Sequence, residues 1–145
     1  MPELCSFDYA VIRVVPRVDR GEFLNAGVIL FCPTEGFLES RIELDRARLA
    51  VIAPTADVVT IESHLAAIPS VCRGGAEAGE IGLLPQRARF HWLVAPRSTI
   101  IQVSPVHSGV GDDLRLALDN LFDKLVRLPV ASKTATSAPS GMTDG

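Results

Sequence analysis

The sequence predicts an α+β domain, in which about four strands form a mostly antiparallel sheet and the helices pack on one face of that sheet. Three observations lead to this fold class. Runs rich in β-branched residues fill the first 44 positions, helical spacing of apolar residues follows, and one short β-type run precedes the last helical segment. The predicted order is β-β-β-α-α-α-β-α.

The first three strands are expected to form an antiparallel meander. Phe7–Val15 is rich in valine and isoleucine and is apolar on both faces, as a central strand would be. The second strand is Val28–Cys32, and a hairpin loop over residues 33–36 joins it to the third, Phe37–Leu44. The third strand alternates apolar with charged residues, which predicts one dry face and one wet face.

The middle of the sequence is predicted to be helical. Asp45–Ala53 is read as a short helix, and Thr55 can cap the next one. Apolar residues then recur at helical spacing over Val58–Ile68. Pro69 is expected to end or kink this helix, because proline has no N–H to donate.

A glycine-rich loop is predicted over Arg73–Gly82. Pro85–Ala95 is read as a helix, with a strand as the competing interpretation. Thr99–Val103 is the fourth predicted strand, and the loop after it contains His107. The last helix, Asp112–Arg127, has one apolar stripe, acidic residues at its start and basic residues at its end, as the helix dipole favours.

The chain length of 145 residues suits a single domain. This domain is predicted to span residues 5–129, and residues 130–145 have the composition of a disordered tail. The sequence has no apolar run long enough for a membrane span and no signal-peptide pattern at its start. Its three cysteines match no metal or redox motif, so the expected location is the cytoplasm.

Candidate ligand-binding residues are basic side chains in or beside the predicted sheet. Arg13 is a charged residue inside an apolar strand, so it is either an anion ligand or an arginine whose stem packs while its head finds a partner. Arg97 and Ser98 offer a guanidinium beside a hydroxyl, and His107 lies just before a helix start. We expect these four residues to bind an anion if their side chains converge.

No catalytic residues are assigned from the sequence. Cys32 ends a buried strand, where a free thiol is usually inert. The histidines have no paired metal-ligand spacing, and the glycine-rich loop lacks the ending of a phosphate loop, so no metal and no cofactor is predicted. The single tryptophan, Trp92, fits the core better than an interface.

Several stretches together resemble the bacterial domain-of-unknown-function family numbered 3037. They are Tyr9–Arg17, Glu22–Phe31, Leu84–Leu93, Ala95–Gln102 and Ser104–Gly109. The resemblance covers about residues 6–127. It implies no activity, because the family has none assigned, but it suggests a protein partner such as a HipA-like kinase.

Three functions are consistent with these observations. The first is a non-catalytic protein-interaction or regulatory module. The alternative is a protein that binds or processes a phosphorylated ligand, such as a nucleotide, in a basic pocket. The second alternative is nucleic-acid binding through the Arg87–Arg97 surface, although the net charge of −3 gives no general attraction to nucleic acid.

Overall fold

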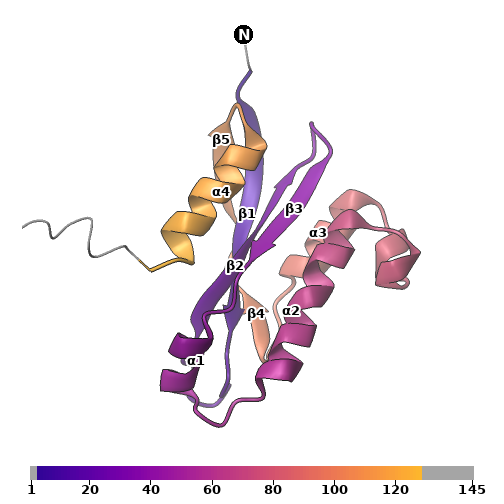
Figure 1. Cartoon of the computed structure of the whole chain (residues 1–145). Helices are drawn as coiled ribbons and strands as arrows, with labels where there is room; N and C mark the ends of the chain where they lie inside the picture. The colour runs from indigo at the N-terminus through magenta and orange to yellow at the C-terminus, as the bar shows by residue number, and fades with distance from the viewer. Residues whose placement is uncertain (1–2, 129–145) are drawn as a thin grey trace, which may run out of the picture.

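A computed structural model describes residues 3–128 and shows one sheet between two layers of helix (Figure 1). The strands are β1 (Cys5–Val14), β2 (Leu24–Cys32), β3 (Phe37–Ile42), β4 (Ile101–Val103) and β5 (His107–Gly111). The helices are α1 (Arg46–Ile52), α2 (Val58–Arg73), α3 (Gln86–Val94) and α4 (Leu114–Leu125). The α+β class and the antiparallel sheet are confirmed. The predicted tail, residues 130–145, lies outside the described residues.

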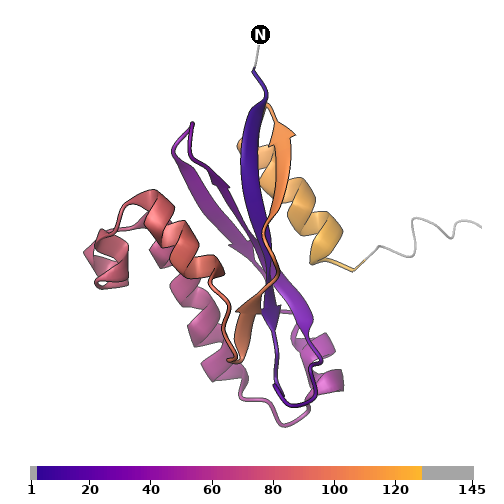
Figure 2. The ribbon, with the colours of Figure 1, turned by 180° about the vertical axis from the view of Figure 1, so that it is seen from behind.

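β1 is the central strand, as its apolar character predicts. It pairs with β2 along one edge and with β4 and β5 along the other, and all of these pairings are antiparallel. Figure 2 shows β5 beside one half of β1 and β4 beside the other half. The sheet order is therefore β3-β2-β1-β4, with β5 also beside β1.

Helices cover both faces of the sheet, which corrects the expectation that they share one face. On one face, Ile29 and Phe31 of β2 pack in a core with α2 and α3. On the other face, Val28 and Leu30 pack against α4 through Leu118. The physical reason is that both faces of β1 and β2 are apolar, so one layer of helices would leave the second face in water.

A β-bulge in β2 explains why this strand starts earlier than predicted. The pairing with β1 shifts between Ile12 and Arg13, which leaves Ala26 as the extra residue. Gly27 follows it where a side chain has no room, because a Cβ atom there would lie 2.8 Å from the Arg41 carbonyl oxygen. The residues around Gly27 are therefore part of β2, where they form a bulge, and not a segment that precedes the strand.

Two details of the helices differ from the prediction. Asp57, not Thr55, caps α2, since its carboxylate accepts the backbone N–H of Thr60 at 3.1 Å. The helix also continues past Pro69 to Arg73, so an end at Pro69 is wrong. Residues 86–94 form α3, which confirms the helical interpretation of that segment.

β5 is the strand that the sequence did not predict. A break at residues 104–106 separates it from β4, and Ser104 keeps the edge of β1 bonded across this break. The Ser104 hydroxyl accepts the N–H of Val11 at 2.9 Å, and the Ser104 N–H donates to the Val11 carbonyl at 2.9 Å. One buried hydroxyl thus takes the place of a backbone partner.

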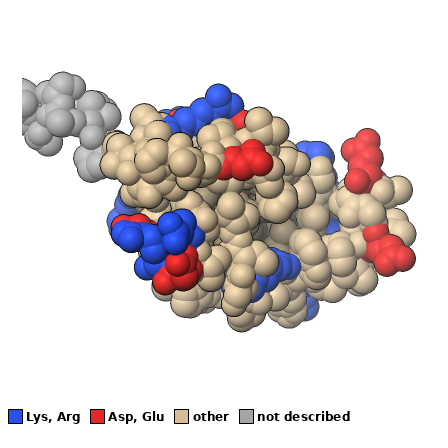
Figure 3. Space-filling view, turned by 90° about the horizontal axis from the view of Figure 1, so that it is seen from below, with Lys and Arg blue, Asp and Glu red and all other residues tan. Residues whose placement is uncertain are grey.

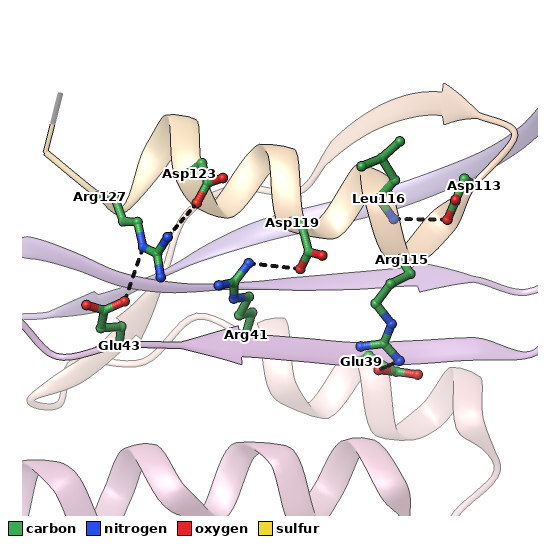
Figure 4. A network of polar contacts seen from close by, with 9 residues as sticks. All are labelled: Glu39, Arg41, Glu43, Asp113, Arg115, Leu116, Asp119, Asp123 and Arg127. Carbon is green, nitrogen blue, oxygen red and sulfur yellow. Dashed lines mark hydrogen bonds and ion pairs between the residues drawn. The ribbon is translucent and has the colours of Figure 1, made fainter. Parts of the chain in front are cut away.

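A ladder of ion pairs joins β3 to α4 (Figure 4). The pairs are Glu39–Arg115, Arg41–Asp119 at 2.9 Å and Glu43–Arg127 at 3.3 Å. The first two pairs follow a common spacing, because two strand residues and four helix residues advance by about 6–7 Å each. The third uses Arg127, which lies just after α4 and also pairs with Asp123 at 3.2 Å. The wet face predicted for this strand is therefore the face that contacts α4.

Replacing Ser104 with alanine should lower the free energy of unfolding by about 1–3 kcal/mol, because the Val11 N–H loses its buried acceptor. Urea unfolding followed by circular dichroism measures this change. Ser98→Ala, at an exposed position, is the matched control and should change the stability by less than about 0.5 kcal/mol. Equal stabilities for the two variants would show that the Ser104 bond is not needed.

A double-mutant cycle on Arg41 and Asp119 should give a coupling energy of about 0.2–1 kcal/mol. The value is small because the two side chains are 36% and 40% exposed, so water screens the pair. The coupling should decrease as salt is added. A coupling that salt leaves unchanged would contradict an electrostatic contact.

Candidate functional site

The candidate site is a cavity of about 170 Å³ between α2, the end of α3 and β4. It lies on the α2–α3 face of the sheet, beside the short edge strand β4. The lining residues are His64, Ala67, Ile68, Trp92, Leu93, Arg97, Thr99, Ile101, Gln102 and Val103. We call this space the α2–α3–β4 cavity.

The interior of the cavity is apolar. Ile68 of α2 and Leu93 of α3 belong to the core, where they are 9% and 3% exposed. Ile101 and Val103 of β4 pair with Val14 and Ile12 of β1 and pack against the same core. An apolar side chain entering this cavity would therefore meet apolar side chains from three elements.

Arg97 supplies a positive charge to the rim. Its guanidinium donates to the backbone carbonyls of Trp92, at 2.5 Å, and Leu93, at 3.2 Å, so it caps the negative end of α3. The same group lies 4.5 Å from the centre of the Trp92 ring, in cation–π geometry. Within residues 3–128 no carboxylate forms an ion pair with Arg97. Because these two bonds occupy only part of its five N–H groups, the guanidinium retains donors for a further anion.

Trp92 and His64 complete the rim, and sequence reasoning missed both as site residues. Trp92 is 42% exposed, so the expectation of a core position is corrected. Its apolar neighbours in α3, Phe90 and Leu93, take the core positions. His64 is exposed on α2, one turn before Ile68. The i,i+4 spacing of His64 and Ile68 was the one available signal, and it does not indicate what packs against the helix.

The predicted ligand residues lie at three separate places. Arg13 faces the α4 side of the sheet, because its partner Asn25 donates to the Leu125 carbonyl of α4. Its guanidinium lies 4.3 Å from the centre of the Phe23 ring. Arg97 is on the opposite side of the sheet, and Ser98 is exposed outside the cavity lining.

His107 does not join Arg13, although the two are on the same face. Its ring packs against that of Tyr9, its partner in β1, in a tilted arrangement with 5.4 Å between the ring centres. Tyr9 and Arg13 are four residues apart along β1, which corresponds to roughly 13 Å at the rise of a strand. The structure therefore does not bring Arg13, Arg97 and His107 into one site.

The Arg87–Arg97 segment does not present all of its basic side chains to solvent. Arg89 donates to the carbonyls of Val71 and Cys72, both at 2.8 Å, and thereby closes the end of α2. Gly74 lies directly beside this guanidinium, where a Cβ atom would be 2.8 Å from its central carbon. Figure 3 shows charges of both signs in small separate groups on a mostly uncharged face. Arg89 therefore has a structural role inside the domain, which leaves fewer basic side chains for the proposed nucleic-acid surface.

The thiols of Cys72 and Cys5 are poor nucleophiles. Burial raises the pKa of Cys72 to about 11, with smaller opposing effects from Ser40 and Arg89. Desolvation, followed by the charge of Glu35, also raises the pKa of Cys5. A thiol whose pKa is raised remains protonated near neutral pH and does not attack as a thiolate. Neither of these thiols therefore adds covalent chemistry, and the α2–α3–β4 cavity combines an apolar interior with one positive charge on its rim.

None of the helices in the described part of the chain combines the length and the apolar composition needed to cross a bilayer.

Searches among curated proteins and among solved structures find no match for this chain. The model of one protein family, described as a protein of unknown function (DUF3037), matches residues 9–126. The matched residues include β1 from Tyr9 onward, the whole of the other four strands and the four helices. They also include every residue that lines the cavity. The chain belongs to the DUF3037 family.

Proposed function

We propose that the domain is a non-catalytic protein-interaction module of the cytoplasm. In this proposal the α2–α3–β4 cavity receives an apolar side chain of a partner protein, and Arg97 binds a carboxylate next to that side chain. The observation that carries the proposal is an apolar cavity whose rim holds a stacked arginine without a carboxylate partner among the described residues.

The size of the cavity favours a side chain over a cofactor. Its volume of about 170 Å³ is below the roughly 300–1,000 Å³ of typical small-molecule and cofactor sites. A leucine or phenylalanine side chain is an occupant of suitable size. Interfaces between proteins often use such an anchor in a pocket, with tryptophan and arginine around it.

The chemistry of the rim favours an acidic neighbour for that anchor. Arg97 is held in place by two carbonyls and by the Trp92 ring, so binding an anion would cost it little further conformational freedom. A carboxylate on the partner would also neutralise a charge that no acidic residue described in the structure neutralises. The partner segment is therefore an apolar residue followed or preceded by an acidic one, or an apolar C-terminal residue.

A HipA-like kinase is the partner suggested by the family resemblance, and it remains a candidate to test. A phosphorylated small ligand has less support, because Arg13 and His107 lie away from Arg97. Inorganic phosphate tests this alternative directly, since phosphate carries the anion without an apolar anchor.

Trp92 provides the readout, because it is the only tryptophan in the chain and lies on the rim of the cavity. N-acetyl-leucine should change its fluorescence saturably, with a Kd of about 1–10 mM as expected from roughly 0.3 kcal/mol per non-hydrogen atom. N-acetyl-leucinamide, which has no carboxylate, should bind about three- to tenfold more weakly. Inorganic phosphate should leave the Trp92 fluorescence nearly unchanged, because it has no apolar group to enter the cavity.

Arg97→Gln should remove the preference for the carboxylate while leaving weak binding of the leucine side chain. Arg87→Gln is the matched control, because Arg87 is an exposed arginine of α3 outside the cavity lining. Circular dichroism melting should show that both variants fold. The proposal fails if the acid and the amide bind equally well to the native protein, or if the two variants behave alike.

A further inference from the structure

We propose that the outer edge of β5 is a self-association surface, where β5 pairs antiparallel with β5 of a second copy of this chain. This inference is independent of the α2–α3–β4 cavity. It rests on the direction of the backbone groups of β5, on the side chains that β5 carries and on the contrast with the opposite edge of the sheet.

The backbone groups of Ser108 and Val110 point away from the sheet. Val11 of β1 and Val15, which directly follows β1, bond through their backbones to the segment on the β4–β5 side. Odd-numbered residues of β1 therefore face that side, and Phe7 and Tyr9 bond to Gly109 and His107. Because strand residues alternate, the N–H and C=O groups of Ser108 and Val110 lie on the outer edge, where no other described strand pairs with them.

The β5 edge carries none of the features that usually prevent strands from pairing between molecules. Residues 107–111 contain no lysine, arginine, acidic residue or proline, and the Val110 side chain is 64% exposed. Gly109 has no side chain, and the Phe7 ring lies against it, so that a Cβ atom would be 2.7 Å from this ring. β5 itself thus has no acidic, lysine or arginine side chain, and the Ser108 hydroxyl donates to the Asp8 carboxylate of β1 at 3.0 Å.

The opposite edge of the sheet is protected. β3 carries Glu39 and Arg41, whose side chains pair with α4, and α2 packs against this strand from the other face. Charged side chains and flanking helices hinder the approach of another strand. The contrast identifies the β5 edge as the accessible one (Figure 2).

A second copy fits this edge because the strand is complementary to itself. With a two-fold axis at Gly109, Ser108 of each chain lies opposite Val110 of the other, and their backbone groups form four hydrogen bonds. His107 then lies opposite a glycine, and Asp112 lies opposite Val106 rather than another acid, so no like charges meet. The glycines at the axis allow the two backbones to approach closely.

The pairing should be weak, with a Kd of roughly 100 µM, because a single strand pair buries less surface than a stable dimer needs. Sedimentation velocity over about 10 µM to 1 mM should show the 15.5 kDa chain converting to a dimer as concentration rises. Hydrogen exchange of the Ser108 and Val110 amides should slow by about fourfold over the same range, as the monomer fraction falls.

Val110→Lys should weaken the dimer by at least about tenfold, because it places a charge at the middle of the paired edge. Val59→Lys is the matched control, since it adds the same charge at a valine of α2 that is 77% exposed, and it should leave the dimer unchanged. A native protein that stays monomeric at the highest concentration overturns the proposal. Association that leaves the Ser108 and Val110 amides unchanged overturns it as well, without relying on either variant.

Discussion

The rest of the structure depends on β1, which is buried on both faces and must be hydrogen-bonded along both edges. An apolar strand in this position requires a helical layer on each side, and α2, α3 and α4 provide these layers. It also requires a partner for every backbone group. β2 supplies partners on one edge, and β4, Ser104 and β5 supply them on the other.

The β4–β5 edge of β1 is divided between two short strands, and each of them carries one of the proposed binding features. β4 is a short strand of residues 101–103, and all three residues line the α2–α3–β4 cavity with residues of α2 and α3. Among the described residues, β1 is the one strand that pairs with β5, so the backbone groups of Ser108 and Val110 have no strand partner there. Ser104 lies between the two pieces and holds both in register with β1. The candidate cavity and the outer edge of β5 therefore lie beside the two halves of the same edge of β1.

Much of the fold could be predicted from the sequence, because local preferences and tertiary packing agree there. β-branched residues indicate β1, and apolar spacing indicates α2 and α4. β5 was missed because Ser108, Gly109 and Gly111 are poor strand formers, and only pairing with β1 makes them a strand. The second helical layer follows from Val28 and Leu30 facing away from Ile29, within an apolar run that occupies both faces of β2.

The candidate site was harder to predict, because it depends on which sheet face and which register each residue occupies. Arg97 was identified by its chemistry, and the structure places it on the cavity rim. Arg13 and His107 have suitable chemistry, but the alternation of β1 and the pairing of Tyr9 with His107 place them elsewhere. His64 belongs to α2, which is distant from β4 in the sequence, so nothing local marks it as a cavity residue. For Trp92 the sequence allows either a core or an interface position, and the structure places it on the rim.

The central claim is that ligands bind this domain at the α2–α3–β4 cavity and not at the other basic residues. Amide chemical-shift mapping of the native protein with N-acetyl-leucine tests this claim most directly, since it reports on every described residue at once. The account predicts the largest shifts in three segments, residues 64–68, 92–99 and 101–103, which contain the residues that line the cavity. Shifts centred on Arg13 or His107, or no saturable shifts at all, would contradict it.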